Sequence, residues 1–476
     1  MRKTSKPSPT EAEFLFEIDP EPAAERLTSY GGAPLLIRTL RSLEVGQSVA
    51  RHIKIKQRQR GYDEATFVES FVLLNGVGGE CLDDFEQLRA DGGLEEMLGH
   101  AIPSPEAARN FLYEFHSEEN IESAKEQRSL GEIAYIPGEN AALRGLGEVN
   151  REVVREVGRR CANQKIATVD QDATIIGSRK QEALRTYEGE RGYQPMLAVW
   201  AEMNLVLADE FRDGNVPAAY PGLAVAKAAY AALPSTVEEF YYRGDSACHE
   251  HELVNWLRDE KREDGPQGFI GFAISARMSP ALRTAVQAVA EGQWEPYGKP
   301  DTEVIRECAD VLFVPNEHSE QKDLQPLRYV AVRIRRRQGG LLEEVADKHF
   351  AVLSNIRDWK AARLLAWHRE KAGTIEAVHD VLKNELSAGV LPCGRFGANA
   401  AWLRLAILTH NVLTALKRLA LPAELLQARP KRLRFLFFNT AGRLVHHARR
   451  TILRLASPVQ RLAEYLAALG MLPLPA

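Results

Sequence analysis

Acidic residues close two predicted β-strands and recur on a later predicted helix. Asp170 and Asp172 lie at the end of the β-rich segment 165–170, Asp245 ends the segment 240–245, and Glu376 lies in the helical segment 373–383. Carboxylate oxygens are the ligands that Mg²⁺ prefers. Two such ions, about 3.5–4 Å apart, can activate water and stabilise the leaving oxygen of a phosphodiester. The pattern therefore predicts a metal-dependent site that acts on phosphodiesters.

Each of these acids also has a purely structural explanation. An Asp at a strand end often caps a turn, so the residues alone leave open whether Asp170 or Asp172 is the functional acid. Glu376 and Lys383 could equally belong to a solvent-facing helix surface. Lys383 follows Glu376 by seven residues, or about two helical turns, so both lie on one face of the helix. A lysine placed there can hold a phosphate beside the metal site.

The periodicity changes from helical to strand-like near residue 165, and the elements that follow must position these acids. Three consecutive strands, a helix, a strand, a helix and a strand is the order of an RNase H-like sheet. We therefore predict an α/β fold, with an RNase H-like core, a β-rich insertion, an N-terminal all-helical domain and C-terminal helices. The predicted strands are 165–170, 196–202, 205–211, 240–245, 269–275, 311–314 and 329–335, and the predicted later helices are 222–232, 357–387, 396–420 and 433–470.

Residues 34–130 have helical periodicity. Ser104-Pro105-Glu106 is a strong helix start, because Ser can cap, Pro suits the first turn and Glu favours the positive end of the helix. A helix-turn-helix reader of DNA and a plain helical bundle both explain this region. Gly145-Leu146-Gly147 is interpreted as a turn and not as a phosphate-binding loop.

The formal net charge is −4 over 476 residues, so the chain as a whole is not a polycation. Its basic residues are nevertheless clustered, and local patches bind phosphate backbones. No acid interrupts the basic run from Arg429 to Arg461, which includes Arg432 and Arg434. A solvated basic helix face explains this run equally well. A second cluster consists of Arg333, Arg335, Arg336 and Arg337.

The five cysteines are scattered and form no Cys-x-x-Cys pair, which argues against a disulfide framework and a structural zinc site. No apolar run reaches the ~18 residues of a membrane span, and no signal peptide is expected. These features predict a cytoplasmic protein.

Three sequence strings resemble those of bacterial insertion-sequence DDE transposases, specifically the group with a β-strand insertion between the second and third acids. The resemblance covers about residues 30–420 and implies that the metal-binding catalytic acids are Asp172, Asp245 and Glu376. Asp172 is preferred to Asp170 because the first acid of the family commonly precedes a small residue and Thr. The strings are TVDQDATIIGS, YYRGDSACHEHELVNWL and AGTIEAVHDVLKNELSAGVLPCGRFGANAAWLRLAILTHNVL.

One departure from the family pattern lies just before the third acid. Related transposases have an Arg four residues before the Glu, where this chain has Ala372. Lys371 is the nearest basic residue, with Trp367 and His368 the nearest aromatic residues. Phosphate binding by Lys371 and base stacking by Trp367 are therefore expectations, and the chemistry after the first nick, including any hairpin intermediate, stays open.

The resemblance implies a complete enzymatic function. The N-terminal helices would bind terminal inverted repeats of double-stranded DNA, and the acids would hold two Mg²⁺ ions, with Mn²⁺ as a substitute. Water would nick one strand at the element end, and the freed 3′-hydroxyl would attack target DNA. Lys383, Lys371, Trp367, Arg333, Arg335, Arg432 and Arg434 would contact DNA, and a homodimer would hold both ends.

Two other functions are considered. The first is a catalytically inactive or domesticated DNA-binding protein that keeps the fold. The second is a glycosyltransferase, because Asp170-x-Asp172 resembles a metal-binding Asp-x-Asp pair. That motif is short, and it leaves Glu376, Lys383 and the basic C-terminal region unexplained.

The predicted domain organisation has six parts. They are a flexible arm (1–30), a helical DNA end-binding region (31–160), the first part of the core (161–290), a β-rich insertion (291–350), the second part of the core (351–425) and a basic C-terminal helical region (426–476).

Overall fold

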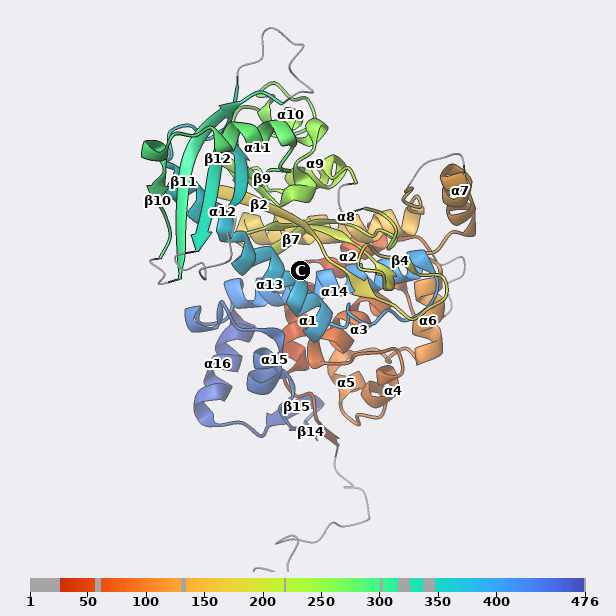
Figure 1. Ribbon diagram of the computed structural model, residues 1–476. Coiled ribbons are helices and arrows are strands. Elements are labelled where there is room, and N and C mark those ends of the chain that lie inside the picture. Colours follow the sequence, from red (N-terminus) through yellow and green to blue (C-terminus); the bar gives the residue numbers. More distant parts are fainter. Residues whose placement is uncertain are drawn as a thin grey trace, which may run out of the picture.

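The computed structural model describes residues 26–55, 61–129, 134–217, 220–299, 303–315, 326–336 and 347–474. A large mixed sheet and its insertion lie at one end of the molecule, at the top of Figure 1, and helices from both ends of the chain lie at the other. Most of the predicted arm, and Arg337, fall outside the described residues.

The central sheet has nine strands, and five of them form the predicted core. Their order is β7-β6-β2-β8-β9. β2 pairs antiparallel with β6 and parallel with β8, and β8 pairs parallel with β9. This is the RNase H-like arrangement, so the predicted fold class is confirmed. The strands are β2 (Ile166–Ala173), β6 (Met196–Trp200), β7 (Leu205–Glu210), β8 (Glu239–Gly244) and β9 (Ile270–Ser275).

The insertion continues the same sheet beyond β9. β13 (Lys348–Ser354) pairs antiparallel with β9 and carries β12 (Leu327–Arg336), β11 (Val304–Phe313) and the short β10 (Glu295–Pro296) outward. The sequence reading missed β13 and the first half of β11. Neither segment has the alternation of apolar and polar residues that marks a half-buried strand, since β13 contains four consecutive apolar residues and β11 begins with two apolar and two charged residues. Only pairing with a neighbouring strand makes such a segment a strand.

Helices α1 to α8 precede the sheet and confirm the helical reading of this region. Ser104 caps α6 as predicted, since its hydroxyl accepts a hydrogen bond from the Ala107 N–H (3.2 Å). The interpretation of Gly145-Leu146-Gly147 as a turn is wrong, because both glycines lie inside α8. A side chain at 145 would lie 2.1 Å from the His52 carbonyl oxygen, so glycine allows α2 and α8 to pack closely. The helices are α1 (Ala33–Ser42), α2 (Val45–His52), α3 (Glu64–Val77), α4 (Asp84–Arg89), α5 (Leu94–Leu98), α6 (Pro105–Tyr113), α7 (Glu118–Ser129) and α8 (Ala141–Arg160).

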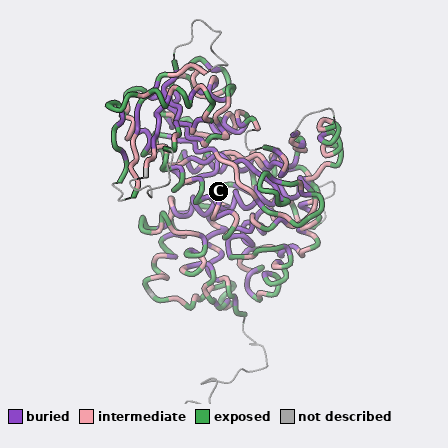
Figure 2. Tube along the Cα trace, viewed as in Figure 1, coloured by how far each residue is buried: buried purple, intermediate pink, exposed green. Residues whose placement is uncertain are grey.

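Other helices join the core to this bundle. α14 packs against α8, α3, α1, α6 and β7, and almost all its residues are buried, as the central part of Figure 2 shows. The predicted helix 357–387 is divided at Glu370 into α12 and α13. The bounds are α9 (Leu223–Ala232), the 3-10 helix η1 (Ser246–Cys248), α10 (His251–Arg258), α11 (Pro280–Gln287), α12 (Ala361–Arg369), α13 (Lys371–Glu385) and α14 (Phe396–Leu419).

The predicted C-terminal helix 433–470 is wrong in its first half. After α15 (Pro430–Leu433) and a π-helical turn (Arg434–Phe438), the chain forms a hairpin of β14 (Gly442–His447) and β15 (Arg450–Leu455), and only then α16 (Val459–Gly470). Ala448 and Arg449 make the turn with positive φ, 48° and 63°. β1 (Leu27–Thr28), in the predicted arm, pairs with β14. Contact with this distant segment stabilises strands that helical periodicity obscured.

A small three-stranded sheet lies outside the central sheet. Its strands, in order, are β3 (Ile176–Gly177), β5 (Arg191–Tyr193) and β4 (Leu184–Arg185). Among the described residues, no helix is long and apolar enough to cross a membrane.

Asn411 links the bundle to the core. Its side-chain oxygen accepts a hydrogen bond from the Val206 N–H (2.9 Å), and its amide donates to the Val206 carbonyl (2.8 Å) and the Asn150 oxygen (2.7 Å). We expect Asn411→Ala to lower the free energy of unfolding by about 2–3 kcal/mol, because buried polar groups lose their partners. Urea denaturation measures this loss. Asn384→Ala, at an exposed site on α13, is the control, and an equal loss there would contradict the assignment.

Candidate active site

Two of the predicted acids lie side by side on neighbouring parallel strands. The parallel register of β2 and β8 pairs Gln171 with Gly244, and Asp172 and Asp245 are the next residues along each strand. Neighbouring strands are about 4.8 Å apart, so the two backbones bring these carboxylates together. β2 extends to Ala173, so Asp172 lies within the strand, not after it as the sequence suggested.

A single lysine faces both aspartates. The Lys371 ammonium, at the start of α13, lies 2.8 Å from the Asp172 carboxylate. Burial lowers the pKa of Lys371, but the charges of Asp172 and Asp245 outweigh burial and raise the pKa overall. Burial and the neighbouring Asp172 raise the pKa of Asp245, against the opposing effect of Lys371. The arrangement concentrates negative charge that a cation compensates.

Asp170 has a different environment. It is fully buried, and its two oxygens accept hydrogen bonds from the Arg243 guanidinium at 2.6 and 2.9 Å. The Thr374 hydroxyl also donates to Asp170. Arg243 in turn donates to the Trp367 carbonyl (2.7 Å) and to Glu370 (3.2 Å). Asp170 therefore joins β2 and β8 to the junction of α12 and α13, and its oxygens have partners within the protein.

The third predicted acid is not joined to the first two. Glu376 is exposed on α13, while Lys383 on the same helix donates to the Thr174 hydroxyl (2.9 Å) just beyond β2. Among the described residues, no group of three acidic, His or Cys side chains has the geometry of a metal site. Asp172 and Asp245 have the chemistry of hard-cation ligands, so the site fits such an ion with two carboxylates in place.

The sequence of residues 17–474 matches the family described as Transposase DDE domain group 1. The chain belongs to this transposase family. Transposases as a class cleave DNA and transfer its strands. No curated protein matches the chain. A solved structure that is similar, a cryo-EM structure of the piggyBac transposase synaptic complex with hairpin DNA, is 11% identical with a TM-score of 0.46, over 85% of this chain and 79% of that one.

His379 of this transposase, which was not among the predicted site residues, lies near Asp172. His379 is buried on α13, and neither ring nitrogen has a hydrogen-bond partner among the described residues. Burial lowers the pKa of His379 to about 4, although the Asp172 carboxylate opposes this shift. The imidazole is therefore neutral at pH 7. Its position three residues after Glu376 was the available signal.

The predicted DNA-binding residues of the insertion and of α12 contact other side chains of the protein. Arg333 pairs with Glu291 (2.6 Å) and Glu307 (3.0 Å), and Arg335 also pairs with Glu307 (2.7 Å). The Trp367 ring packs beside other aromatic rings and under the Arg243 guanidinium. These contacts do not support the prediction that Arg333, Arg335 and Trp367 offer free groups to DNA.

The two predicted C-terminal arginines of this transposase differ. Arg434 donates to the carbonyls of Asn75 (2.7 Å), Gly76 (3.0 Å) and Glu385, so it connects α3 to α13 and its DNA-binding role is also unsupported. Arg432 is exposed, with its guanidinium 5.8 Å from the centre of the exposed Phe435 ring. Sequence clustering could not separate the packed arginine from the accessible one.

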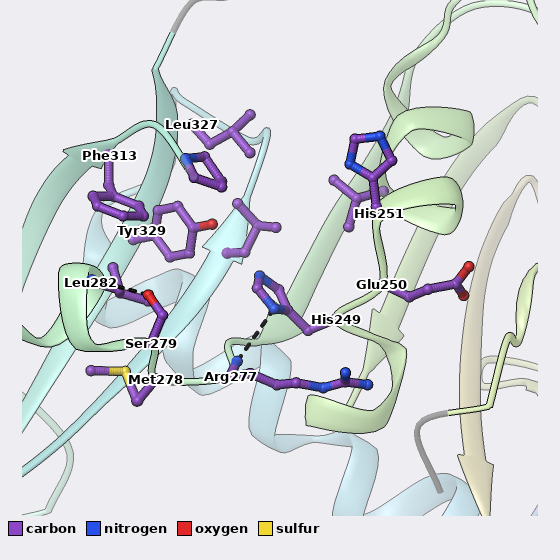
Figure 3. Close-up of a pocket in the computed structure, with 13 residues that line it drawn as sticks. His249, Glu250, His251, Arg277, Met278, Ser279, Leu282, Phe313, Leu327 and Tyr329 are labelled. Atoms are coloured by element: carbon purple, nitrogen blue, oxygen red, sulfur yellow. Dashed lines mark hydrogen bonds between the residues drawn. The ribbon is translucent and has the colours of Figure 1, made fainter. Parts of the chain in front are cut away.

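A cavity of about 410 Å³ lies between α10 and the β11–β12 pair of this transposase (Figure 3). Phe313 and Tyr329 line one wall, with ring centroids 5.7 Å apart. Arg277 also lines the cavity and donates to the carbonyls of Ser246 (2.9 Å) and Ala247 (3.0 Å), directly after Asp245. The cavity is therefore linked to the turn after Asp245 through Arg277, and none of the candidate acids lines it.

We expect the two aspartates of the Asp170-x-Asp172 pair to respond differently to substitution. Asp170→Asn should lower the free energy of unfolding by about 3–5 kcal/mol, because it leaves the buried Arg243 charge uncompensated. Asp172→Asn should lower the free energy of unfolding much less, because Asp245 still lies near Lys371 and compensates its charge. Urea denaturation of both variants at pH 7 measures the difference, and equal losses would contradict the distinct roles.

Proposed function

We propose that this chain is an active transposase that cuts DNA at the ends of its element and transfers the freed strand, with Asp172, Asp245 and Glu376 as catalytic, metal-binding acids. The observation that carries the proposal is the placement of Asp172 and Asp245 on adjacent strand ends, facing one buried lysine. A role in stabilising the fold explains Asp170, but it does not explain why Asp172 and Asp245 lie side by side.

Asp172 and Asp245 would supply oxygen ligands to two Mg²⁺ ions or to Mn²⁺, and Glu376 would complete the set from α13. When bound, such ions activate water and stabilise developing charge on phosphate oxygens. Lys371 compensates the aspartates in the structure described. Its ammonium can pair with a DNA phosphate when cations take over that role, which fits its proposed place among the DNA contacts.

Other residues of the chain would position DNA and α13. Lys383 holds α13 against the segment after β2 through Thr174, within reach of a backbone phosphate beside Glu376. His379 remains uncharged there, so it adds no positive charge that would compete with bound cations. The N-terminal helices and the exposed Arg432 would bind double-stranded DNA, both terminal inverted repeats and target, and a homodimer would hold two ends.

One observation favours the alternative of a DNA-binding protein without catalysis. Glu376 is not gathered with the aspartates, as catalysis would require. No observation favours the glycosyltransferase alternative. The Arg243 guanidinium binds both oxygens of the buried Asp170, so only one carboxylate of the Asp-x-Asp pair is accessible to a metal ion.

A cleavage assay tests the proposal. The purified full chain is incubated with Mg²⁺ and labelled duplexes that carry the ends of the element encoding it. We expect nicking at the end, abolished by EDTA and reduced about a thousandfold or more by Asp172→Ala, Asp245→Ala or Glu376→Ala, because each removes a metal ligand.

Glu263→Ala, at an exposed position after α10, is the control and should cut like the unaltered protein. Binding of the same duplex should persist in the three acid variants. If the unaltered protein binds the end and never cuts it, the DNA-binding alternative holds. If Glu376→Ala cuts normally, Glu376 is not the third acid.

A further inference from the structure

The β14–β15 hairpin has two faces of different character. Alternate residues of a strand point to opposite faces, so each register pair belongs to one of them. On the inner face, Leu444 is buried opposite Leu453. His446 and Thr451 form the next pair, and both contact Glu96 of α5, at 3.4 and 2.8 Å. The inner face therefore fixes the hairpin to the helical body.

The outer face carries positive charge at both ends. Arg443 lies opposite Arg454, and His447 lies opposite Arg450 beside the turn. Between these pairs lie Val445 and Ile452, and Ile452 is 40% exposed. Within the described part of the chain, neither Arg450 nor Arg454 has a carboxylate at ion-pair distance.

Folding alone does not explain the residues at the tip of the hairpin. The left-handed turn is made by Ala448 and Arg449, where Asn and Gly are the favoured residues. Arg449 therefore adds a further cation at the tip in a conformation that its side chain does not favour. A ligand that carries negative charge would offset this cost.

We propose that the outer face of the β14–β15 hairpin is a docking surface for the sugar-phosphate backbone of duplex DNA. A two-stranded ribbon is of a size that enters the major groove. Arginines at both ends of the face then meet phosphates, and the apolar pair between them packs against the groove. This inference rests on the proposed function for its choice of polyanion, but it does not require the acids to be catalytic.

Charge complementarity distinguishes this surface from the other basic clusters. Arg333 and Arg335 are paired with glutamates, and Arg434 is bound to main-chain carbonyls. The hairpin lies at the end of the molecule opposite the sheet insertion, at the bottom of Figure 1. DNA bound there and at the acids would therefore extend along the molecule, past α13.

The test measures binding of the full chain to a labelled duplex of arbitrary sequence by fluorescence anisotropy, in EDTA and over a range of salt concentrations. Arg450→Glu combined with Arg454→Glu should weaken binding at least roughly tenfold near 0.1 M salt. It should also reduce the slope of log Kd against log salt by about 2, because each arginine lost removes one phosphate contact. The double Lys variant, R450K/R454K, should retain most of the slope.

The control carries the same change in charge away from the hairpin and the N-terminal helices, at two exposed residues, Lys261→Glu after α10 with Arg283→Glu on α11, and should change the slope little. Circular dichroism checks that all variants are folded. If R450E/R454E binds like this control, the inference is overturned. It is also overturned if that variant loses binding to anionic lipid vesicles while its duplex binding is unchanged. Because EDTA blocks cleavage, failure of the proposed catalysis would leave this result intact.

Discussion

The buried ion pair between Asp170 and Arg243 is the interaction on which the arrangement of the site depends. The two residues lie opposite each other on β2 and β8, and Arg243 also reaches the main chain of Trp367 at the end of α12. A charge buried without a partner is costly, so neither strand can shift along the other without breaking the pair. The same pair therefore fixes the register that places Asp172 beside Asp245.

A second group of opposite charges lies near the ends of β2 and β8. Two aspartates share the Lys371 ammonium, so the site compensates its own negative charge when only the protein is present. Divalent cations would compete with this lysine for the same oxygens. The buried pair maintains the structure, whereas the half-buried Asp172 and Asp245 and the ammonium of Lys371 have partners that can be exchanged. This difference in burial separates two aspartates that stand two residues apart.

Arginine illustrates the same distinction elsewhere in the chain. Arg333 and Arg434 belong to basic clusters, yet their guanidinium groups satisfy glutamates and helix-end carbonyls. Arg450 and Arg454 belong to an equally basic segment, but the hairpin directs them outward. Net charge and clustering describe the sequence, and only the direction of each side chain determines which cations can meet a phosphate.

The sequence by itself determined the five core strands, the helical N-terminal region and the candidates Asp172 and Asp245, because alternating apolar residues and strand-end acids are local patterns. It could not determine β13, the β14–β15 hairpin or the packing of Gly145 against α2, since each exists only through contact with a distant segment. Nor could it decide between Asp170 and Asp172 on physical grounds, or foresee that His379 is buried near the acids. Those differences depend on burial and on cross-strand partners, which the tertiary structure alone supplies.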